Sequence, residues 1–356
     1  MHFEISNNAI IGWDIGGAHL KAVALVDGQV VAVEQTACPL WQGLLELDLA
    51  LDRILDRLPS FSKPRHVITM TGELTDAFAS RSEGVLAITE VATRRFGRES
   101  VHLFSGDKRP VPAADVSPDM TGRMASANWL ASGFSLAGRI AHGLFMDVGS
   151  TTTDLLLIEN HQPRYRGYAD NERLFYQELM YTGIVRTPVM MMAKAAPLRG
   201  QWAHVMAEVF ATSADVYRLT GELQEAADQY PAADHGAKSP AGSQLRLARQ
   251  FGYDAMDLSP KALLQLSAFI REQQIQQLRS GVDIQLSLGS LDDSAPLIGA
   301  GIGRFLVKDL ARRLRRPYKD FGDLFKGNRP SLGFDISDMA PAAAVAFLAF
   351  DAAIDP

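Results

Sequence analysis

Apolar runs broken by short polar or glycine-containing segments dominate the first forty residues. The runs at 9–15, 20–26 and 30–36 are each short and bounded by turn-forming residues, a pattern typical of β-strands. Asp27-Gly28 separates the second and third runs and is a strong hairpin signal. The pattern therefore predicts that three strands joined by tight turns open the fold.

Helical spacing then alternates with further strands. Residues 43–58 carry leucine and isoleucine at helical spacing, and helices are also predicted at 82–97 and 121–137. Short apolar strands are predicted at 67–70 and 101–104, whereas the glycine and prolines of 105–118 indicate a loop. Strands followed by alternating helices and strands predict an α/β domain.

A second strand-turn-strand pattern starts the sequence of elements again at 144–158. Beyond it we predict mostly helix over 170–218, a loop over 220–243, helices at 244–251 and 260–279, and strands at 286–288 and 296–298. The glycine-rich segment 299–303 is predicted to open a helix that runs to about 314, and a last helix is predicted at 338–353. Because 356 residues exceed the usual size of one core, two domains are expected. Their predicted extents are 1–142 together with a packed-back helix at 335–356, and 143–334 with a helical insertion around 170–280.

The two strand-turn-strand segments carry the same chemistry. Asp14 ends one apolar run and precedes Gly16-Gly17, and Asp147 ends another and precedes Gly149-Ser150-Thr151-Thr152. A lone carboxylate is costly to bury, and glycine lets a backbone approach a ligand closely. We therefore predict two phosphate-facing hairpins with carboxylates suited to Mg²⁺.

A third glycine-rich segment is Gly299-Ala300-Gly301-Ile302-Gly303, which follows an apolar strand and precedes a predicted helix. The N–H groups at a helix N-terminus favour an anion. Alone, this segment is equally consistent with close helix packing. The order of hairpin, hairpin and glycine turn is more specific than any of its parts.

Composition narrows the class of protein. The net charge of −6 argues against nucleic-acid binding, which favours basic surfaces. A single cysteine leaves no intramolecular disulfide framework, so a cytoplasmic location is expected. The apolar stretch 340–353 contains Pro341 and Asp351 and is too short to span a bilayer, so no membrane association is predicted.

The order of the three glycine turns resembles the ASKHA superfamily, which includes actin, sugar kinases and heat-shock ATPases. The resemblance implies an α/β fold of two ribonuclease-H-like (actin-like) domains with a ligand cleft between them. It also identifies the hairpins as phosphate-1 and phosphate-2 loops, and Gly299–Gly303 as the adenosine motif.

A narrower resemblance rests on six segments, which are Trp13–Lys21, Thr69–Asp76, Asn128–Ala131, Asp147–Asp154, Tyr181–Pro188 and Ala211–Tyr217. This set is similar to the hydantoinase A-related proteins of tetrahydromethanopterin-linked one-carbon metabolism, whose archaeal relatives act in methanofuran biosynthesis. The resemblance implies a transferase that joins the furanylmethyl group of (5-aminomethylfuran-3-yl)methyl diphosphate to the phenol of a tyramine or glutamyl-tyramine acceptor. Diphosphate is the leaving group, and the partners are small molecules.

The candidate residues follow from this chemistry. Asp14 and Asp147 are predicted to be catalytic and to hold the metal, since a departing diphosphate needs its charge neutralised. Lys21 is a candidate point charge for the phosphates or an ordinary surface lysine, and Glu73 is a candidate general base. The predicted phosphate contacts are Gly16, Gly17, Gly149, Ser150, Thr151, Thr152, Gly301 and Arg186. For Arg186 a structural salt bridge is an equal alternative.

Two other functions stay open at this stage. The same hairpins would hold ATP, as in an ATP-dependent small-molecule kinase or a hydantoinase- or oxoprolinase-like hydrolase of the ASKHA fold. A non-catalytic nucleotide-binding assembly protein is the third reading. The acceptor, the identity of the metal and a homo-oligomeric state are not determined by the sequence.

Overall fold

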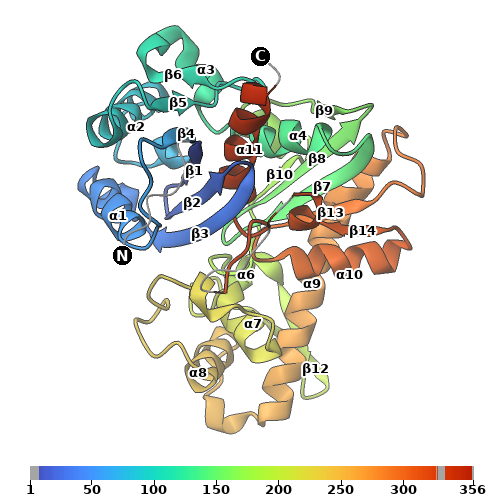
Figure 1. Cartoon of the computed structure of the whole chain (residues 1–356). Helices are drawn as coiled ribbons and strands as arrows, with labels where there is room; N and C mark the ends of the chain where they lie inside the picture. Colours follow the sequence, from blue (N-terminus) through green and yellow to red (C-terminus); the bar gives the residue numbers. More distant parts are fainter. Residues whose placement is uncertain (1–7, 326, 328–332, 355–356) are drawn as a thin grey trace. The chain divides into compact units, whose positions relative to one another are not determined.

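The computed structural model describes residues 8–325, 327 and 333–354, and the chain divides into two compact units (Figure 1). One unit comprises 1–145, 156–165 and 319–356, and the other comprises 146–155 and 166–318. The domain extents predicted from the sequence remain a prediction. Their parts at 1–7, 326, 328–332 and 355–356 lie outside the described residues.

The first unit contains a six-stranded sheet in the order β3-β2-β1-β4-β5-β6. The three predicted opening strands are confirmed, and they pair antiparallel, whereas β1 pairs parallel with β4, and β4 pairs parallel with β5. The two-residue β6 pairs antiparallel with β5 within the predicted loop. The strands are β1 (Ala9–Ile15), β2 (His19–Val26), β3 (Gln29–Ala37), β4 (Arg65–Met70), β5 (Val101–Leu103) and β6 (Val111–Pro112).

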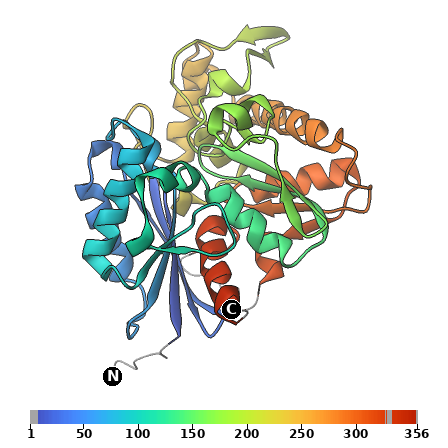
Figure 2. The ribbon, with the colours of Figure 1, turned by 90° about the horizontal axis from the view of Figure 1, so that it is seen from above.

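Helices cover both faces of this sheet (Figure 2). On one face, α1 (Leu45–Leu55) and α2 (Arg81–Phe96) share a buried core with Ile11, Trp13 and Ile15. On the other face, α11 (Ala340–Ile354) packs against β1 and against α4 (Asn128–Ala137). Gly12 permits this approach, because a Cβ at Gly12 would lie 2.1 Å from the Ala342 carbonyl oxygen. Successive residues of β1 therefore face different helical layers: Ile11, Trp13 and Ile15 face α1 and α2, whereas Gly12 faces α11.

The second sheet has the order β10-β8-β7-β13-β14, with β9 also beside β8. This order repeats β3-β2-β1-β4-β5 strand for strand, as two related halves require. The strands are β7 (His142–Val148), β8 (Thr153–Glu159), β9 (Gln162–Arg164), β10 (Leu179–Met180), β13 (Leu297–Ala300) and β14 (Tyr318–Asp320). Two mixed sheets with this repeated order confirm the predicted α/β class of two ribonuclease-H-like folds.

The insertion between β8 and β13 differs from the prediction. Residues 170–218 are not mostly helical, because prolines and a tight turn divide them: Pro188 precedes a one-turn helix, and Arg199-Gly200, both at positive φ, turn β11 into β12. The insertion contains α5 (Asp170–Phe175), α6 (Val189–Met192), β11 (Ala195–Leu198), β12 (Gln201–His204), α7 (Ser213–Thr220), α8 (Pro240–Gln250) and α9 (Pro260–Leu286), and α10 (Arg304–Leu314) follows β13. Its buried side chains form a core of their own around α7, α8 and α9.

Two further predictions are wrong in detail. The helix predicted at 121–137 is interrupted between α3 (Thr121–Met124) and α4, where Ser126 adopts φ 52°. The strand predicted at 286–288 is absent, because α9 keeps burying residues at helical spacing as far as Gln285 and continues to Leu286. Gly289, at φ 74°, follows in the left-handed region.

The structure also bears on the single cysteine and on the apolar character of the helices. Burial raises the pKa of the Cys38 thiol to about 12, which disfavours the reactive thiolate. Within the described part of the chain, none of the helices combines the length and the apolar character that a membrane crossing requires.

One buried histidine links the first sheet to its helical layer. His66 on β4 is 4% exposed, and its Nδ1 accepts a hydrogen bond from Trp13 Nε1 at 3.0 Å. Its ring stacks on Phe96 with the ring centroids 3.7 Å apart. Burial lowers the pKa of His66 from 6.5 to about 3, so the imidazole stays neutral in the folded protein.

We predict that this histidine makes the protein acid-sensitive. The unfolded chain takes up its proton near pH 6.5 and the folded protein only near pH 3, so stability is lost as the pH falls through that window. The loss should reach about 2 kcal/mol between pH 6.5 and 5. Urea unfolding of wild type and His66→Gln across this range measures it, with exposed His142→Gln as the control. Equal pH slopes for wild type and His66→Gln would contradict the prediction.

Candidate functional site

The first hairpin is closed by one backbone hydrogen bond. The Gly16 N–H donates to the His19 carbonyl at 3.0 Å, so the chain reverses between β1 and β2 within four residues. The backbone after β3 supports the turn, since Cys38 N donates to Ala18 O at 2.9 Å and Leu40 N to Gly17 O at 3.1 Å. The turn at the end of β1 is therefore a fixed structure.

Asp14 lies at the end of β1 just before this turn and is 5% exposed. In the sheet register it stands beside Lys21 on β2 and Thr69 on β4, so the three side chains share one face. Lys21 Nζ lies 3.9 Å from Asp14 Oδ2. The sequence predicted both residues separately, and the register explains why they meet.

Glu73 lies on the 3₁₀ turn Gly72–Leu74 that follows β4. The turn packs on the first hairpin, because a Cβ at Gly72 would lie 3.1 Å from the Ile15 carbonyl oxygen. Glu73 is 2% exposed, and its Oε1 accepts from Ser126 N at 2.8 Å and Ser126 Oγ at 3.0 Å. These bonds hold the break between α3 and α4 in place. The role of Glu73 as a general base stays a prediction.

The second hairpin repeats the closure of the first. The Gly149 N–H donates to the Thr152 carbonyl at 2.9 Å. A segment far along the chain supports this turn, since the carbonyl of Ser150 accepts from Val185 N at 3.1 Å and Arg186 N at 2.9 Å. A Cβ at Gly183 would lie 2.5 Å from the Ser150 carbonyl carbon, so only glycine fits there.

The segment 182–187, which we call the strap, is itself fixed by a buried glutamine. Gln274 on α9 donates from Nε2 to Thr182 Oγ1 at 2.8 Å and to Gly183 O at 2.9 Å, and its Oε1 accepts from the Tyr217 hydroxyl. The insertion therefore positions the backbone that carries Arg186. The Tyr181-Thr182-Gly183 motif was evident in the sequence, but its partner Gln274 was not.

The third glycine segment packs on the second hairpin. Gly301 has φ 76°, and a Cβ there would lie 2.3 Å from Val148 O and 2.4 Å from Asp147 Oδ1. Gly303 N donates to Val148 O at 2.8 Å, and α10 begins at Arg304. The structure thus brings Asp147, Gly149–Thr152, Gly301 and the strap together in one unit.

The predicted residues accordingly form two groups. Asp14, Gly16, Gly17, Lys21 and Glu73 surround the first hairpin in one unit, and the remaining predicted residues surround the second hairpin in the other. Among the described residues, no three His, Cys, Asp or Glu side chains form a cluster that could hold a metal ion by themselves.

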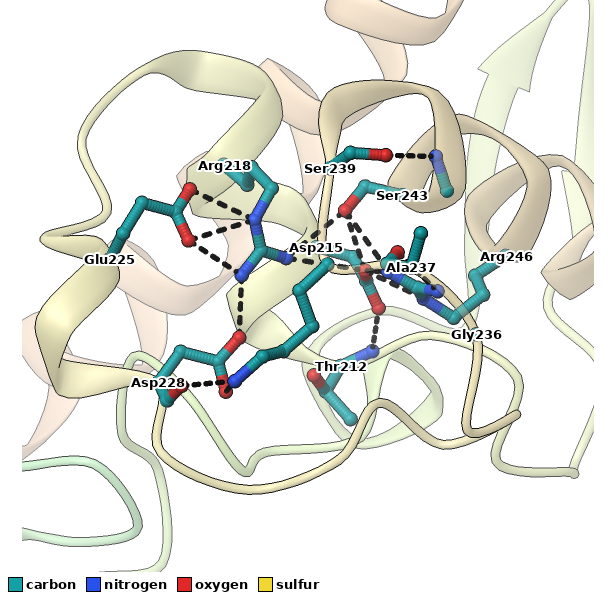
Figure 3. Close-up of polar contacts among 12 residues, drawn as sticks. Thr212, Asp215, Arg218, Glu225, Asp228, Gly236, Ala237, Ser239, Ser243 and Arg246 are labelled. Carbon is teal, nitrogen blue, oxygen red and sulfur yellow. Dashed lines mark hydrogen bonds and ion pairs between the residues drawn. The ribbon is translucent and has the colours of Figure 1, made fainter.

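A buried ionic network in the insertion was missed by the sequence reasoning (Figure 3). Arg218 and Arg246 have side chains that are 2% and 1% exposed. Asp215 on α7 accepts from Arg246 Nε at 2.8 Å and from Ser243 Oγ at 2.7 Å. Arg218 donates to Glu225 at 2.9 Å and also to Asp228. The three-residue spacing of Asp215 and Arg218 was the only local signal of this network.

Arg186 of the strap also contacts the 221–239 loop, which the buried ionic network binds. The Arg186 side chain is exposed, and its guanidinium carbon lies 5.7 Å from the centroid of the Tyr230 ring. That distance lies within the range of a cation–π interaction. An aromatic residue of the 221–239 loop therefore lies beside the arginine of the strap.

Curated relatives point to an enzyme. The chain is 26% identical over 301 residues to a protein of Methanocaldococcus jannaschii, covering 84% of this chain and 88% of the relative. That protein is (4-{4-[2-(gamma-L-glutamylamino)ethyl]phenoxymethyl}furan-2-yl)methanamine synthase. A synthase of the same name from Methanococcus vannielii is 29% identical over 99 residues, or 28% of this chain and 41% of the relative. No protein-family model matches the chain.

Solved structures with a related course of the chain include two nucleotide complexes. The activator of 2-hydroxyisocaproyl-CoA dehydratase from Clostridium difficile with bound ADPNP has a TM-score of 0.47 and 12% identity, with 98% of this chain and 96% of that chain covered. A ROK family glucokinase from Streptomyces griseus in complex with glucose and AMPPNP has a TM-score of 0.46 and 14% identity, with 97% and 100% covered.

We predict that Gly301→Ala destabilises the second unit more than a change at a similar glycine elsewhere. The Cβ would meet both Val148 O and Asp147 Oδ1, in addition to the left-handed backbone. Gly289→Ala is the matched control, since Gly289 has φ 74° and nothing within 4 Å of its Cβ position. Gly301→Ala should cost roughly 1–3 kcal/mol more than Gly289→Ala in urea unfolding. Equal losses would show that the close contact is not real.

We also predict that Asp215→Asn destabilises the insertion strongly, because it removes the more buried of the two carboxylates, Asp215 and Asp234, that pair with the buried Arg246 guanidinium. The expected loss in free energy of unfolding is about 3–5 kcal/mol. Asp283→Asn is the control, since Asp283 forms an exposed pair with Arg279 and should cost about 0–1 kcal/mol. Thermal and urea unfolding of both variants tests the difference, and comparable losses would contradict it.

Proposed function

We propose that this protein is a transferase of methanofuran-type cofactor biosynthesis, linked to tetrahydromethanopterin-dependent one-carbon metabolism. It joins the furanylmethyl group of (5-aminomethylfuran-3-yl)methyl diphosphate to the phenol of a tyramine or glutamyl-tyramine acceptor and releases diphosphate. The observation that carries the proposal is the similarity over 84% of the chain to a synthase whose named product contains a phenoxymethyl-furan ether and an aminomethyl group.

The two hairpins suit the leaving group in this proposal. The bond between the furanylmethyl carbon and the diphosphate oxygen breaks, and the phenol oxygen forms the new ether bond to the same carbon. Negative charge then develops on the diphosphate, and fixed donors stabilise it best when they are already in place. Gly16, Gly17, Gly149–Thr152, Gly301 and Arg186 are the proposed donors, and Lys21 adds a positive charge beside the first hairpin. The phenol proton passes to a base, for which Glu73 is the proposed residue.

Mg²⁺ is the proposed cofactor, and its proposed protein ligands are Asp14 and Asp147. The donor set fits this ion, because Mg²⁺ in phosphate-transfer sites is commonly held by one or two carboxylates together with the substrate phosphates. The Gly301 backbone comes so close to the Asp147 carboxylate that a side chain would displace it, so that carboxylate is held beside the glycine turn. When bound, the ion neutralises charge on the departing diphosphate.

ATP binding is the alternative, since phosphate loops of this kind serve nucleotides equally well. An ATP-dependent kinase or hydrolase would release ADP or phosphate without forming the ether. A nucleotide-binding assembly protein would bind ATP and turn over neither substrate. Fold alone does not separate these functions.

The direct test is incubation of the purified protein with the furanylmethyl diphosphate, tyramine or glutamyl-tyramine, and Mg²⁺. Mass spectrometry should detect the ether, and a coupled assay should detect released diphosphate in equal amount. Asp14→Asn and Asp147→Asn should each lower the rate by roughly 10²- to 10³-fold, since each removes a negative ligand of the proposed metal.

Exposed aspartates provide the controls for this test. Asp107→Asn, in the same unit as Asp14, and Asp283→Asn, in the same unit as Asp147, should leave the rate unchanged. Release of ADP from ATP with no ether formed would replace the proposal with the kinase or hydrolase function.

A further inference from the structure

We propose that Tyr230 is a positioning residue, which holds the Arg186 guanidinium ready for the diphosphate of the substrate. The inference rests on the proposed function, because it assigns Arg186 to the diphosphate. No sequence motif indicated Tyr230. The inference also gives the buried arginines of the insertion a role, which is to hold the loop that carries this tyrosine.

The backbone of Arg186 is fixed, but its side chain is long. The Arg186 and Val185 N–H groups both donate to the Ser150 carbonyl, which ties this part of the strap to the second hairpin. The residue as a whole is exposed. A free arginine side chain has many rotamers, and it loses that freedom when it binds an anion. A contact that holds the side chain before binding removes part of this loss.

The Tyr230 ring supplies such a contact. The Arg186 guanidinium carbon lies 5.7 Å from the ring centroid, and the planar guanidinium can lie over an aromatic face while its N–H groups stay directed outward. Arg186 can therefore keep this contact when a phosphate is bound.

The buried network holds the part of the loop that carries Tyr230. Two residues before the tyrosine, Asp228 is 8% exposed and accepts from Arg218 Nη2, and its backbone carbonyl accepts from Lys238 Nζ (Figure 3). Arg218 is itself held on α7 and donates to Ser243 Oγ at 3.2 Å. The charged groups thus link the loop to α7 and α8, which fixes the base from which Tyr230 reaches the strap.

The experiment measures binding of inorganic diphosphate in the presence of Mg²⁺ by isothermal titration calorimetry. It compares wild type, Arg186→Ala, Tyr230→Ala and the double variant. Arg186→Ala should weaken binding by roughly tenfold to a hundredfold, as expected for a lost charge-assisted hydrogen bond. Tyr230→Ala should weaken it roughly threefold to thirtyfold, in the range of a cation–π contact.

The double variant distinguishes positioning from an independent role. If Tyr230 acts through Arg186, the double variant binds no more weakly than Arg186→Ala, so the two effects are not additive. Tyr230→Phe keeps the ring and should bind like wild type. Additive losses, or a Tyr230→Phe variant as weak as Tyr230→Ala, would overturn the inference.

A similar pair elsewhere in the same unit is the control. The Arg199 guanidinium carbon lies 5.4 Å from the Tyr253 ring centroid, and Tyr253→Ala should leave diphosphate binding unchanged. If wild type does not bind Mg²⁺-diphosphate, the proposed function fails and the inference fails with it. If wild type binds and Tyr230→Ala binds equally well, only the inference fails.

Discussion

The backbone hydrogen bond that closes each hairpin is the constraint on which the candidate site depends. In one unit it joins Gly16 to His19, and in the other it joins Gly149 to Thr152. Each bond forces the chain to reverse within four residues, and so places an aspartate at the end of the strand two residues before the turn. The carboxylate, the glycine and the backbone of the turn then lie together for geometric reasons. A looser turn would separate these groups even if every residue were kept.

The sequence was informative where structure is local. Alternation, turn dipeptides and helical spacing predicted the opening strands and most helices, and both aspartates were placed at strand ends. Contacts between segments far apart in the chain could not be predicted in this way. The strap at 182–187 binds the second hairpin through the Ser150 carbonyl, and Gln274, about 90 residues later in the chain, holds the strap through Thr182 Oγ1 and the Gly183 carbonyl. The region 170–218 was predicted as mostly helix, but Pro188 and the Arg199-Gly200 turn divide it into short helices and strands. Tyr230 carried no local signal, because its significance depends on Arg186 in another segment.

The insertion illustrates how buried charge can specify a loop. Arg218 and Arg246 would be costly to bury alone, and their carboxylate partners come from α7 and from the 221–239 loop. Apolar packing of α7, α8 and α9 gives the insertion its stability, but it does not determine the course of an irregular loop. Several directional bonds to two guanidinium groups do, since each bond has a narrow range of distance and angle.

The two hairpins share a backbone, but they differ in charge. Lys21 stands seven residues after Asp14, and by the same count Asp154 stands seven residues after Asp147. The first hairpin thus pairs its aspartate with a lysine at 3.9 Å. At the corresponding place the second has another carboxylate, which binds the buried Arg173 at 2.8 Å. In the proposed Mg²⁺–diphosphate complex, Lys21 would therefore add a positive charge for which the second hairpin has no counterpart at the corresponding position.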